Sequence, residues 1–253
     1  MSSETLKKLE AKQGAVGIVG LGYVGLPLVK AFCAKNISIV GFDIDEQKID
    51  KLNDGKSYIK HIPDSDIAAM RQADLFEATS DFSEIAKMDA IIICVPTPLS
   101  KHREPDLGPV LSTGASIAPH LQKGQLVVLE SSTYPGTTDS ELAGVLAQSG
   151  LKKDEDFYLA YSPEREDPGN ETFSTSTIPK IVGADTPLAR DMAVAVYDGV
   201  ISEIIPVASS RTAEAIKLTE NIFRSVNIAL VNELKVIFDA MDIDVWDVID
   251  SNT

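Results

Sequence analysis

Residues Ala15–Pro27 read AVGIVGLGYVGLP, an apolar run followed by a glycine-rich turn and the start of a helical pattern. Gly20, Gly22 and Gly25 form the pattern G-x-G-x-x-G. In a strand-turn-helix unit, the first glycine permits the tight turn, the second lets the backbone approach a phosphate, and the third lets the helix pack on the strand. The amino end of the helix then faces the anion. The stretch therefore predicts a site for a dinucleotide pyrophosphate.

A second apolar run, Ile37–Phe42, follows the predicted helix Val24–Lys35 and ends at Asp43. Asp43 lies 18 positions after Gly25, where a dinucleotide fold places the carboxylate that accepts hydrogen bonds from the adenosine ribose. Because a carboxylate there repels a 2′-phosphate, the pattern favours NAD over NADP. The alternative is a structural glycine-rich turn with Asp43 in a solvated loop. The agreement of strand, glycines, helix, second strand and acid in one register favours NAD.

The composition limits the partners that the chain can have. Its 253 residues include 38 acidic and 23 basic side chains, and the net charge of -15 repels phosphate backbones and anionic lipid. We therefore expect no nucleic-acid and no membrane partner, and no apolar run reaches the roughly 20 residues that span a bilayer. Cys33 and Cys94 make no disulfide framework, and the first residues have no signal-peptide core. These features predict a cytoplasmic protein.

Strand and helix patterns alternate along most of the chain. Strands are predicted at 15–19, 37–42, 75–79, 89–95, 125–130, 157–161, 180–183 and 203–207, and helices at 24–35, 46–53, 64–73, 110–120, 139–148, 187–197 and about 209–241. The alternation predicts an α/β fold with a Rossmann-type, doubly wound and mainly parallel sheet. Residues 1–14 form a polar lead-in, 15–207 an NAD-binding domain, and 208–253 a long helix that begins a central or dimerisation domain.

Two loops that follow predicted strands carry candidate cofactor contacts. Proline cannot extend a central strand, so the apolar run to Val95 leaves the sheet at Pro96-Thr97-Pro98. Ligands of such folds bind at this carboxyl edge, which makes Val95 and Thr97 candidates. The next run leads into the hydroxyl-rich loop 131–138, where Thr133 could bind phosphate, ribose or a reactive water. Serine and threonine also cap helices, but we favour the functional role for Thr133.

Polar residues after residue 161 suggest a substrate site. The segment SPEREDPGN, residues 162–170, follows an apolar strand. Such a cluster is commonly a solvated turn, but its position favours a site. Farther along, Lys217, Asn221 and Arg224 share one face of the long helix, since they are spaced at i, i+4 and i+7. The alternative is a solvated stripe, but two cations and an amide suit a phosphate or a sugar.

These motifs resemble the UDP-sugar 6-dehydrogenases of the UDP-glucose/GDP-mannose dehydrogenase family. The closest resemblance is to members acting on UDP-N-acetylglucosamine or UDP-N-acetylmannosamine. It covers nearly the whole chain and rests on VGIVGLGYVGLPL, GFDID, ICVPTPL, ESSTYPGTT, SPEREDPGN and AEAIKLTENIFRSVNIALVNEL. Such enzymes oxidise the sugar C6 alcohol to a carboxylate with two NAD, through an aldehyde and then a thiohemiacetal and thioester on a cysteine. The resemblance thus implies an NAD-dependent oxidoreductase for surface polysaccharide precursors, with UDP-N-acetylglucosamine favoured.

The resemblance also implies roles for individual residues. NAD-binding residues are Gly20, Gly22, Tyr23, Val24, Gly25, Asp43, Lys48, Val95, Thr97 and Thr133. Residues that bind the UDP-N-acetylhexosamine are Arg165, Glu166, Lys217, Asn221 and Arg224, and catalytic residues are Lys217, Glu164, Asn221 and Thr133. Lys48 would lie near the adenosine ribose, Glu164 would assist thioester hydrolysis, and Lys217 would stabilise the C6 oxygen as it loses its proton. We assign no metal ligands.

One part of the family pattern is missing. The nucleophilic cysteine belongs to a Gly-Gly-His-Cys segment that this sequence does not contain, and Cys33 and Cys94 fall in a helix and a buried strand typical of core positions. We therefore expect a chain truncated before that cysteine, which binds NAD, forms a homodimer through 208–253 and cannot complete the oxidation. The alternatives are a β-hydroxyacid dehydrogenase, which shares the Rossmann domain and long helix, and a non-catalytic NAD-binding or dimerisation module.

Overall fold

The computed structural model describes residues 4–101, 104–164 and 178–251. It contains two compact units, Met1–Ala215 and Ile216–Thr253. Among the residues that the structure describes, the first unit holds eight strands, namely β1 (Val16–Val19), β2 (Ile39–Phe42), β3 (Phe76–Thr79), β4 (Ala90–Ile93), β5 (Leu126–Leu129), β6 (Tyr158–Tyr161), β7 (Lys180–Ala184) and β8 (Ile204–Val207). They form one sheet in the order β3-β2-β1-β4-β5-β6-β7-β8. All neighbouring strands run parallel except β6 and β7, which are antiparallel. The predicted doubly wound, mainly parallel α/β fold is confirmed.

The α-helices of the described residues are α1 (Glu4–Glu10), α2 (Gly25–Cys33), α3 (Glu46–Asn53), α4 (Asp64–Gln72), α5 (Gly108–Ile117), α6 (Ala143–Leu146), α7 (Pro187–Tyr197), α8 (Ser210–Ala240) and α9 (Val245–Asp250). The 3-10 helices are η1 (Phe82–Lys87), η2 (Ala118–His120) and η4 (Ala147–Ser149), and η3 (Thr137–Leu142) is a π-helix. The regular helix predicted at 139–148 was wrong in type, since η3, α6 and η4 together replace it.

Both faces of the sheet are covered, which explains the continuous apolar strands. Side chains alternate along a strand, so Ile18, Ile92 and Val128 join one core with residues of α2 and α7. Their neighbours Val127 and Leu129 point to the other face and are also fully buried. On that second face β6 contacts η3, and α5 packs against α6.

The order of the strands fixes where a ligand can bind. Chain progression reverses between β1 and β4, which lie side by side at the middle of the sheet. In open α/β sheets of this order, ligands bind outside the carboxyl ends of the strands at such a switch point. Here those ends lead into Gly20 after β1 and Cys94 after β4, where the Cys94 N–H donates to Val19 O.

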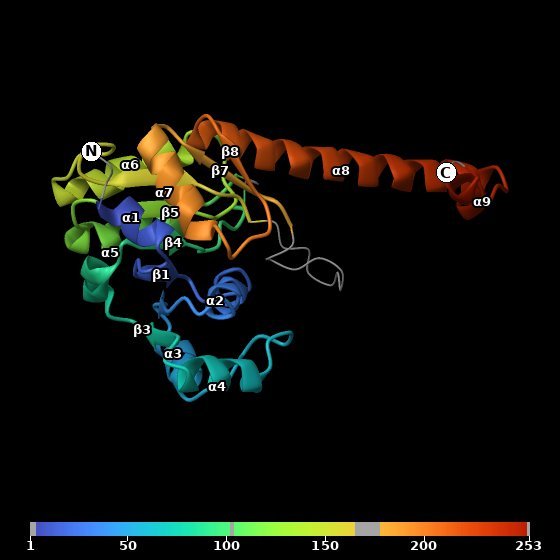
Figure 1. Ribbon diagram of the computed structural model, residues 1–253. Helices are drawn as coiled ribbons and strands as arrows, with labels where there is room; N and C mark the ends of the chain where they lie inside the picture. The colour runs from blue at the N-terminus through green and yellow to red at the C-terminus, as the bar shows by residue number, and fades with distance from the viewer. Residues whose placement is uncertain (1–3, 102–103, 165–177, 252–253) are drawn as a thin grey trace. The chain divides into compact units, whose positions relative to one another are not determined.

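The amino-terminal segment, predicted as a polar lead-in, contains a docked helix. Leu6 and Leu9 of α1 are buried, and α1 contacts α7, beside which it lies in Figure 1. Just after α1, Lys12 Nζ donates to Asp198 O at 2.6 Å and pairs with Asp198 Oδ2 at 3.1 Å. Lys12, in the turn after α1, therefore binds Asp198, the residue that follows α7.

The second unit consists of most of α8, which begins in the first unit, followed by α9. The long helix predicted at about 209–241 is confirmed as Ser210–Ala240, and the short α9 after it was not predicted. Asp244 caps α9 by accepting the Trp246 N–H at 2.9 Å. Over residues 4–101, 104–164 and 178–251, no helix is both long enough and apolar enough to cross a membrane.

Candidate cofactor and active site

Gly20, Gly22 and Gly25 of the turn after β1 each require glycine for a different structural reason. Gly20 has φ of +93°, which disfavours any side chain, and a Cβ there would lie 2.9 Å from Cys94 O. A Cβ on Gly25 would lie 1.9 Å from Gly20 O, so α2 packs closely on the turn. At Gly22, apart from the two chain neighbours, no atom of the described residues lies within 4 Å of a built Cβ. Gly22 therefore leaves open space, as an approaching phosphate requires.

Asp43 lies against this turn. It is 7% exposed, and its Oδ2 accepts the Leu21 N–H at 3.0 Å while its Oδ1 accepts the Asp45 N–H at 3.0 Å. Lys48 Nζ pairs with Asp43 Oδ2 at 3.3 Å. The predicted cofactor residues Asp43 and Lys48 are thus brought together with the glycine turn, and the carboxylate is held by backbone donors at the end of β2.

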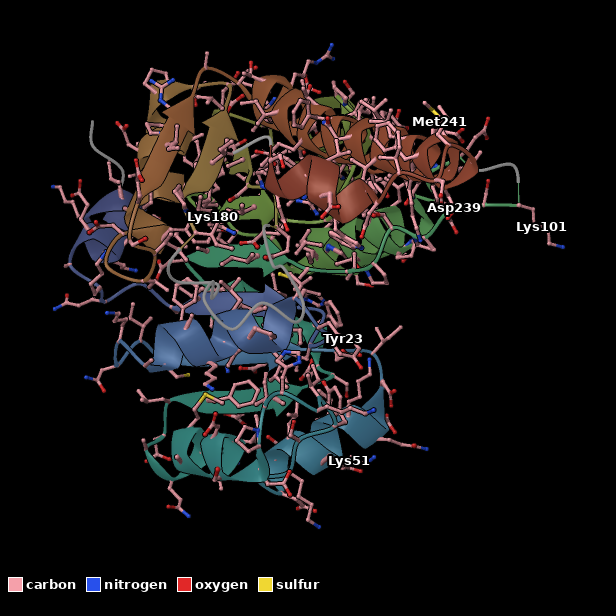
Figure 2. The ribbon with its side chains drawn as sticks, turned by 90° about the vertical axis from the view of Figure 1, so that its right-hand side faces the viewer. Tyr23, Lys51, Lys101, Lys180, Asp239 and Met241 are labelled. Atoms are coloured by element: carbon pink, nitrogen blue, oxygen red, sulfur yellow. The ribbon has the colours of Figure 1, made fainter. Side chains whose placement is uncertain are left out.

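Two tyrosines border the same turn. The Tyr58 hydroxyl donates to Leu21 O, and Lys48 Nζ lies 5.9 Å from the centre of the Tyr58 ring. Tyr23, labelled in Figure 2, is 65% exposed. Its ring centre lies 6.1 Å from that of His61. Val24, the residue that precedes α2, is half-buried against the core. Asp43 thus holds the peptide group before the Leu21 Cα, and Tyr58 holds the one after it.

The loops after β4 and β5 are hydrogen-bonded to each other. Thr97 Oγ1 donates to Ser132 O at 2.6 Å, and Ser131 Oγ donates to Val95 O at 2.5 Å. Val95 and Thr97 therefore lie next to the hydroxyl-rich loop that carries Thr133. The structure brings these three predicted cofactor residues to one region of the carboxyl edge.

The hydroxyl-rich loop is anchored by a buried carboxylate from α8. Glu214 is fully buried, and it accepts the Gly136 N–H at 2.7 Å, the Thr138 N–H at 2.9 Å and the Thr138 hydroxyl at 2.7 Å. Burial raises the pKa of Glu214, while the bonds from Thr138 act to lower it. The carboxylate thus serves as the acceptor for the first N–H groups of η3. The shape of the loop that holds Thr133 depends on Glu214.

A buried ion pair lies next to the carboxyl end of β5, on the face of the sheet that α7 covers. Lys180 Nζ pairs with Glu130 Oε2 at 3.0 Å, and the Tyr197 hydroxyl donates to Glu130 Oε1. Lys180, labelled in Figure 2, also lies 4.9 Å from the centre of the Tyr197 ring. Burial raises the pKa of Glu130 to about 7, and Lys180 opposes that rise. Burial acts to lower the pKa of Lys180, but the Glu130 and Glu164 carboxylates raise it overall.

Glu164 follows β6 and is half-buried. Its charge raises the pKa of Glu130 and of Tyr197, so it lies close to the buried pair. The predicted substrate residues Arg165 and Glu166 lie outside the described residues. The structure thus places one of these three residues, Glu164, beside the carboxyl edge.

Three further predicted residues lie on α8 within the second unit. Lys217 is half-buried, and Asn221 and Arg224 are exposed. Their i, i+4 and i+7 spacing on a continuous helix places them on one face, as predicted. Their roles toward a substrate stay predictions.

Both cysteines occupy core positions. Cys33 lies in α2, its Sγ donates to Leu75 O at 3.2 Å, and burial raises its pKa to about 12. Cys94 is 7% exposed at the end of β4 and belongs to the core that contains α2 and α7. A thiol with a raised pKa is a poor nucleophile, so the geometry gives Cys33 no catalytic role.

The residues of the first unit fit a dinucleotide. Gly22 offers backbone with open space, Gly25 brings α2 close to the turn, and Asp43 presents a carboxylate beside Leu21. These features are the ones that a pyrophosphate and an adenosine ribose require. The arrangement can hold a dinucleotide with its adenosine at β2 and its other end directed toward β4 and β5.

Several residues around the site were missed by sequence analysis. These are Tyr58, Glu130, Tyr161, Lys180, Tyr197 and Glu214. A partial signal existed, because Glu130 ends an apolar strand and Lys180 begins one, where an unpaired charge is costly. Their pairing across 50 positions leaves no local pattern.

Comparison with known proteins gives a family match over most of the chain. Residues 14–201 match the NAD binding domain of the UDP-glucose/GDP-mannose dehydrogenase family, and residues 211–252 match the central domain of that family. The UDP-N-acetyl-D-glucosamine 6-dehydrogenase of Pseudomonas aeruginosa is 40% identical over 231 residues, which are 90% of this chain and 54% of the relative. The UDP-N-acetyl-D-mannosamine dehydrogenase of Salmonella typhi is 36% identical, over 92% of this chain and 57% of the relative. The chain thus spans about half the length of the curated relatives it matches.

Solved structures agree with this match. The UDP-D-ManNAc dehydrogenase of Pyrococcus horikoshii is 32% identical with a TM-score of 0.86, over 93% of this chain and 56% of that chain. A GDP-mannose dehydrogenase from Pseudomonas aeruginosa, solved as a ternary complex, is 27% identical with a TM-score of 0.87, over the same shares of the two chains.

Proposed function

We propose, since the chain belongs to the UDP-glucose/GDP-mannose dehydrogenase family, that it forms the NAD-binding half of an enzyme that oxidises the C6 alcohol of a UDP-N-acetylhexosamine. UDP-N-acetylglucosamine is the favoured substrate, and the uronic acid would serve as a precursor of surface polysaccharide. The names of the relatives support this substrate class. The single observation that carries the proposal is the glycine turn with Asp43 bound to the Leu21 N–H.

The NAD site is built by residues of the first unit. Gly22 would receive the pyrophosphate, Asp43 would accept hydrogen bonds from the adenosine ribose, and Thr97 and Thr133 would contact the other end. Tyr23, Val24, Lys48 and Val95 would border the cofactor. Bound NAD would supply a hydride acceptor, used twice in a four-electron oxidation. The balance is one alcohol, one water and two NAD⁺ giving one carboxylate, two NADH and three protons.

The proposed catalytic residues would handle charge and protons. The Lys217 ammonium would stabilise the C6 oxygen as its proton leaves, which is electrostatic work that needs no proton transfer to the lysine. Glu164, next to a buried charge pair, would take a proton from the water that releases the acid. Asn221 and Arg224 would hold the substrate and that water. Arg165 and Glu166 would border the sugar.

The 253-residue chain by itself is proposed to bind NAD without completing the oxidation. The second hydride transfer needs a thiol that accepts the aldehyde, and Cys33 and Cys94 are core residues. The test is to mix the purified 253-residue chain with NAD and UDP-N-acetylglucosamine and follow NADH by absorbance. NAD binding without NADH release is expected. Sustained release of two NADH per sugar would contradict this part of the proposal.

We also propose that the chain forms a homodimer through residues 208–253. Large apolar side chains are exposed on the second unit, among them Ile222, Phe223, Val226, Ile237 and Trp246. Such exposure on a helix commonly marks an interface. Light scattering behind size exclusion should give twice the monomer mass for the wild type and a smaller mass for Phe223→Asp. A monomeric wild type at all concentrations would contradict the dimer.

A further inference from the structure

Two hydroxyl groups lie side by side at the carboxyl edge of the sheet without a hydrogen-bond partner. Thr133 is 7% exposed in the loop after β5, and Tyr161 is fully buried at the end of β6. Within the described residues, neither Thr133 Oγ1 nor Tyr161 OH makes a hydrogen bond of normal geometry. Buried polar groups are nearly always satisfied, and leaving a hydroxyl unpaired destabilises the folded chain. Two neighbouring buried hydroxyls that depart from this rule indicate a place where a polar ligand can bind.

The surroundings of Tyr161 keep its hydroxyl a donor. Burial raises the pKa of Tyr161 above its usual range, weak hydrogen bonding with Thr133 partly lowers it, and the Glu214 and Glu130 carboxylates raise it further. The two hydroxyls are thus close enough to influence one another, yet they are not joined by a bond of normal geometry. Each hydroxyl can donate one hydrogen bond and accept others. Together they can hold a group that has both a carbonyl and an N–H.

The position of this pair matches one end of the proposed cofactor. Asp43 marks the adenosine end at β2, and the glycine turn after β1 marks the pyrophosphate. From there the sheet continues through β4 to β5 and β6, in steps of about 4.8 Å. The second nucleoside must extend in this direction, roughly two to three strands beyond the turn. Thr97, between the turn and Thr133, is already bonded to the β5 loop.

We propose that Tyr161 is a further residue of the cofactor site, where its hydroxyl and that of Thr133 bind the carboxamide of the nicotinamide ring. This inference rests on the proposed NAD site. The carboxamide oxygen accepts from one hydroxyl and its NH₂ donates to the other, so both groups are satisfied when the ring is bound. Tyr161 is therefore a binding residue, and in the chain without cofactor its unpaired hydroxyl lowers the free energy of unfolding.

The test compares two ligands and two tyrosines. NAD and ADP-ribose are titrated calorimetrically into the wild type, Tyr161→Phe, Thr133→Val and Tyr158→Phe, and each free protein is melted. ADP-ribose carries the adenosine and pyrophosphate but no nicotinamide. Tyr158 is the matched control, since it lies three residues earlier on β6 and is half-buried.

We expect Tyr161→Phe to weaken NAD binding about fivefold or more, to leave ADP-ribose binding unchanged, and to keep or raise the melting temperature of the free chain. Thr133→Val should behave in the same way, and Tyr158→Phe should change neither affinity. Equal NAD affinity for the wild type and Tyr161→Phe would overturn the proposal, as would an equal loss for both ligands. A lower melting temperature for both hydroxyl variants would show a structural role and also overturn it. If the wild type binds neither ligand, the proposed function itself fails.

Discussion

Asp43 Oδ2 accepts the backbone N–H of Leu21 at 3.0 Å, which joins the end of β2 to the glycine turn after β1. The carboxylate is 7% exposed and has Lys48 as its counter-ion. One side chain therefore shapes the turn and presents a negative charge where the adenosine ribose would lie. This double role links the local fold to the choice of cofactor.

Replacing Asp43 should change cofactor preference. In Asp43→Asn the negative charge is lost and Lys48 is released, so a 2′-phosphate is no longer repelled. We expect the preference for NAD over NADP to fall by about tenfold or more, which is roughly 1.4 kcal/mol. Competitive titration of the two dinucleotides measures it, and Asp45→Asn, which alters a neighbouring exposed cap, is the control. An unchanged preference would argue against a ribose contact.

Gly25→Ala should destabilise the first unit. The new Cβ would lie 1.9 Å from Gly20 O, so the turn and α2 must separate, at a cost of about 1–3 kcal/mol. Gly144→Ala is the matched control, because it lies within α6 and, outside its chain neighbours and its own helix backbone, no described atom comes within 4 Å of the Cβ. That substitution should stabilise by about 0.5–1 kcal/mol. Urea unfolding distinguishes the two, and equal midpoints would refute the close packing.

The buried pair of Glu130 and Lys180 should make stability depend on pH. The pKa of Glu130 is about 7 in the folded chain against an ordinary 4.5, so the folded state binds the extra proton between these values. This group's contribution to stability therefore declines as the pH rises through that window. Lys180→Met removes the charge that opposes the rise, so the pKa of Glu130 moves further up. At pH 5.5 the carboxyl is neutral in both proteins, whereas at pH 8 the wild type alone has Lys180 to stabilise the ionised carboxylate.

The loss of stability in Lys180→Met should accordingly be larger at pH 8, at about 3 kcal/mol, than at pH 5.5. Denaturant unfolding of wild type and variant at the two pH values gives the difference. Lys152→Met, which removes an exposed pair with Glu155, should show little loss at either pH. A loss for Lys180→Met that is the same at both values would mean that Glu130 does not titrate.

Glu214→Gln should loosen the loop after β5. The carboxylate accepts bonds from the Gly136 and Thr138 N–H groups, and one of these donors would face the amide NH₂ of glutamine. We expect a loss of about 1–3 kcal/mol in unfolding free energy. Glu141→Gln, at an exposed position of η3, should be neutral. Hydrogen exchange of the Thr138 amide locates the effect, and unaltered protection there would contradict the anchor.

The sequence was most informative where its signals are local. The run before Gly20 is continuously apolar, which is typical of a strand in a parallel sheet covered on both faces, so it predicted β1 without tertiary knowledge. The spacing from Gly25 to Asp43 placed the carboxylate near the turn. The long helix followed from a stretch without proline or glycine. These features follow from residue type and periodicity alone.

Features that join distant segments could not be predicted in this way. Glu130 meets Lys180 and Tyr197 only because β7 turns back antiparallel to β6, and nothing in the strand pattern marks that reversal. Glu214 lies 76 positions after its partner Thr138, and its carboxylate accepts the N–H groups at the start of η3.

The proposed NAD site depends most directly on whether Gly22 receives a pyrophosphate. Apart from the two chain neighbours, a built Cβ at Gly22 meets no described atom within 4 Å, so Gly22→Val should fold as well as the wild type while its side chain fills the space next to the backbone. Calorimetric titration of NAD into the two proteins, with their melting temperatures, makes the test. We predict saturable NAD binding by the wild type and an affinity at least about tenfold lower for Gly22→Val, with similar melting temperatures. Equal NAD affinity for the two folded proteins would contradict the cofactor site.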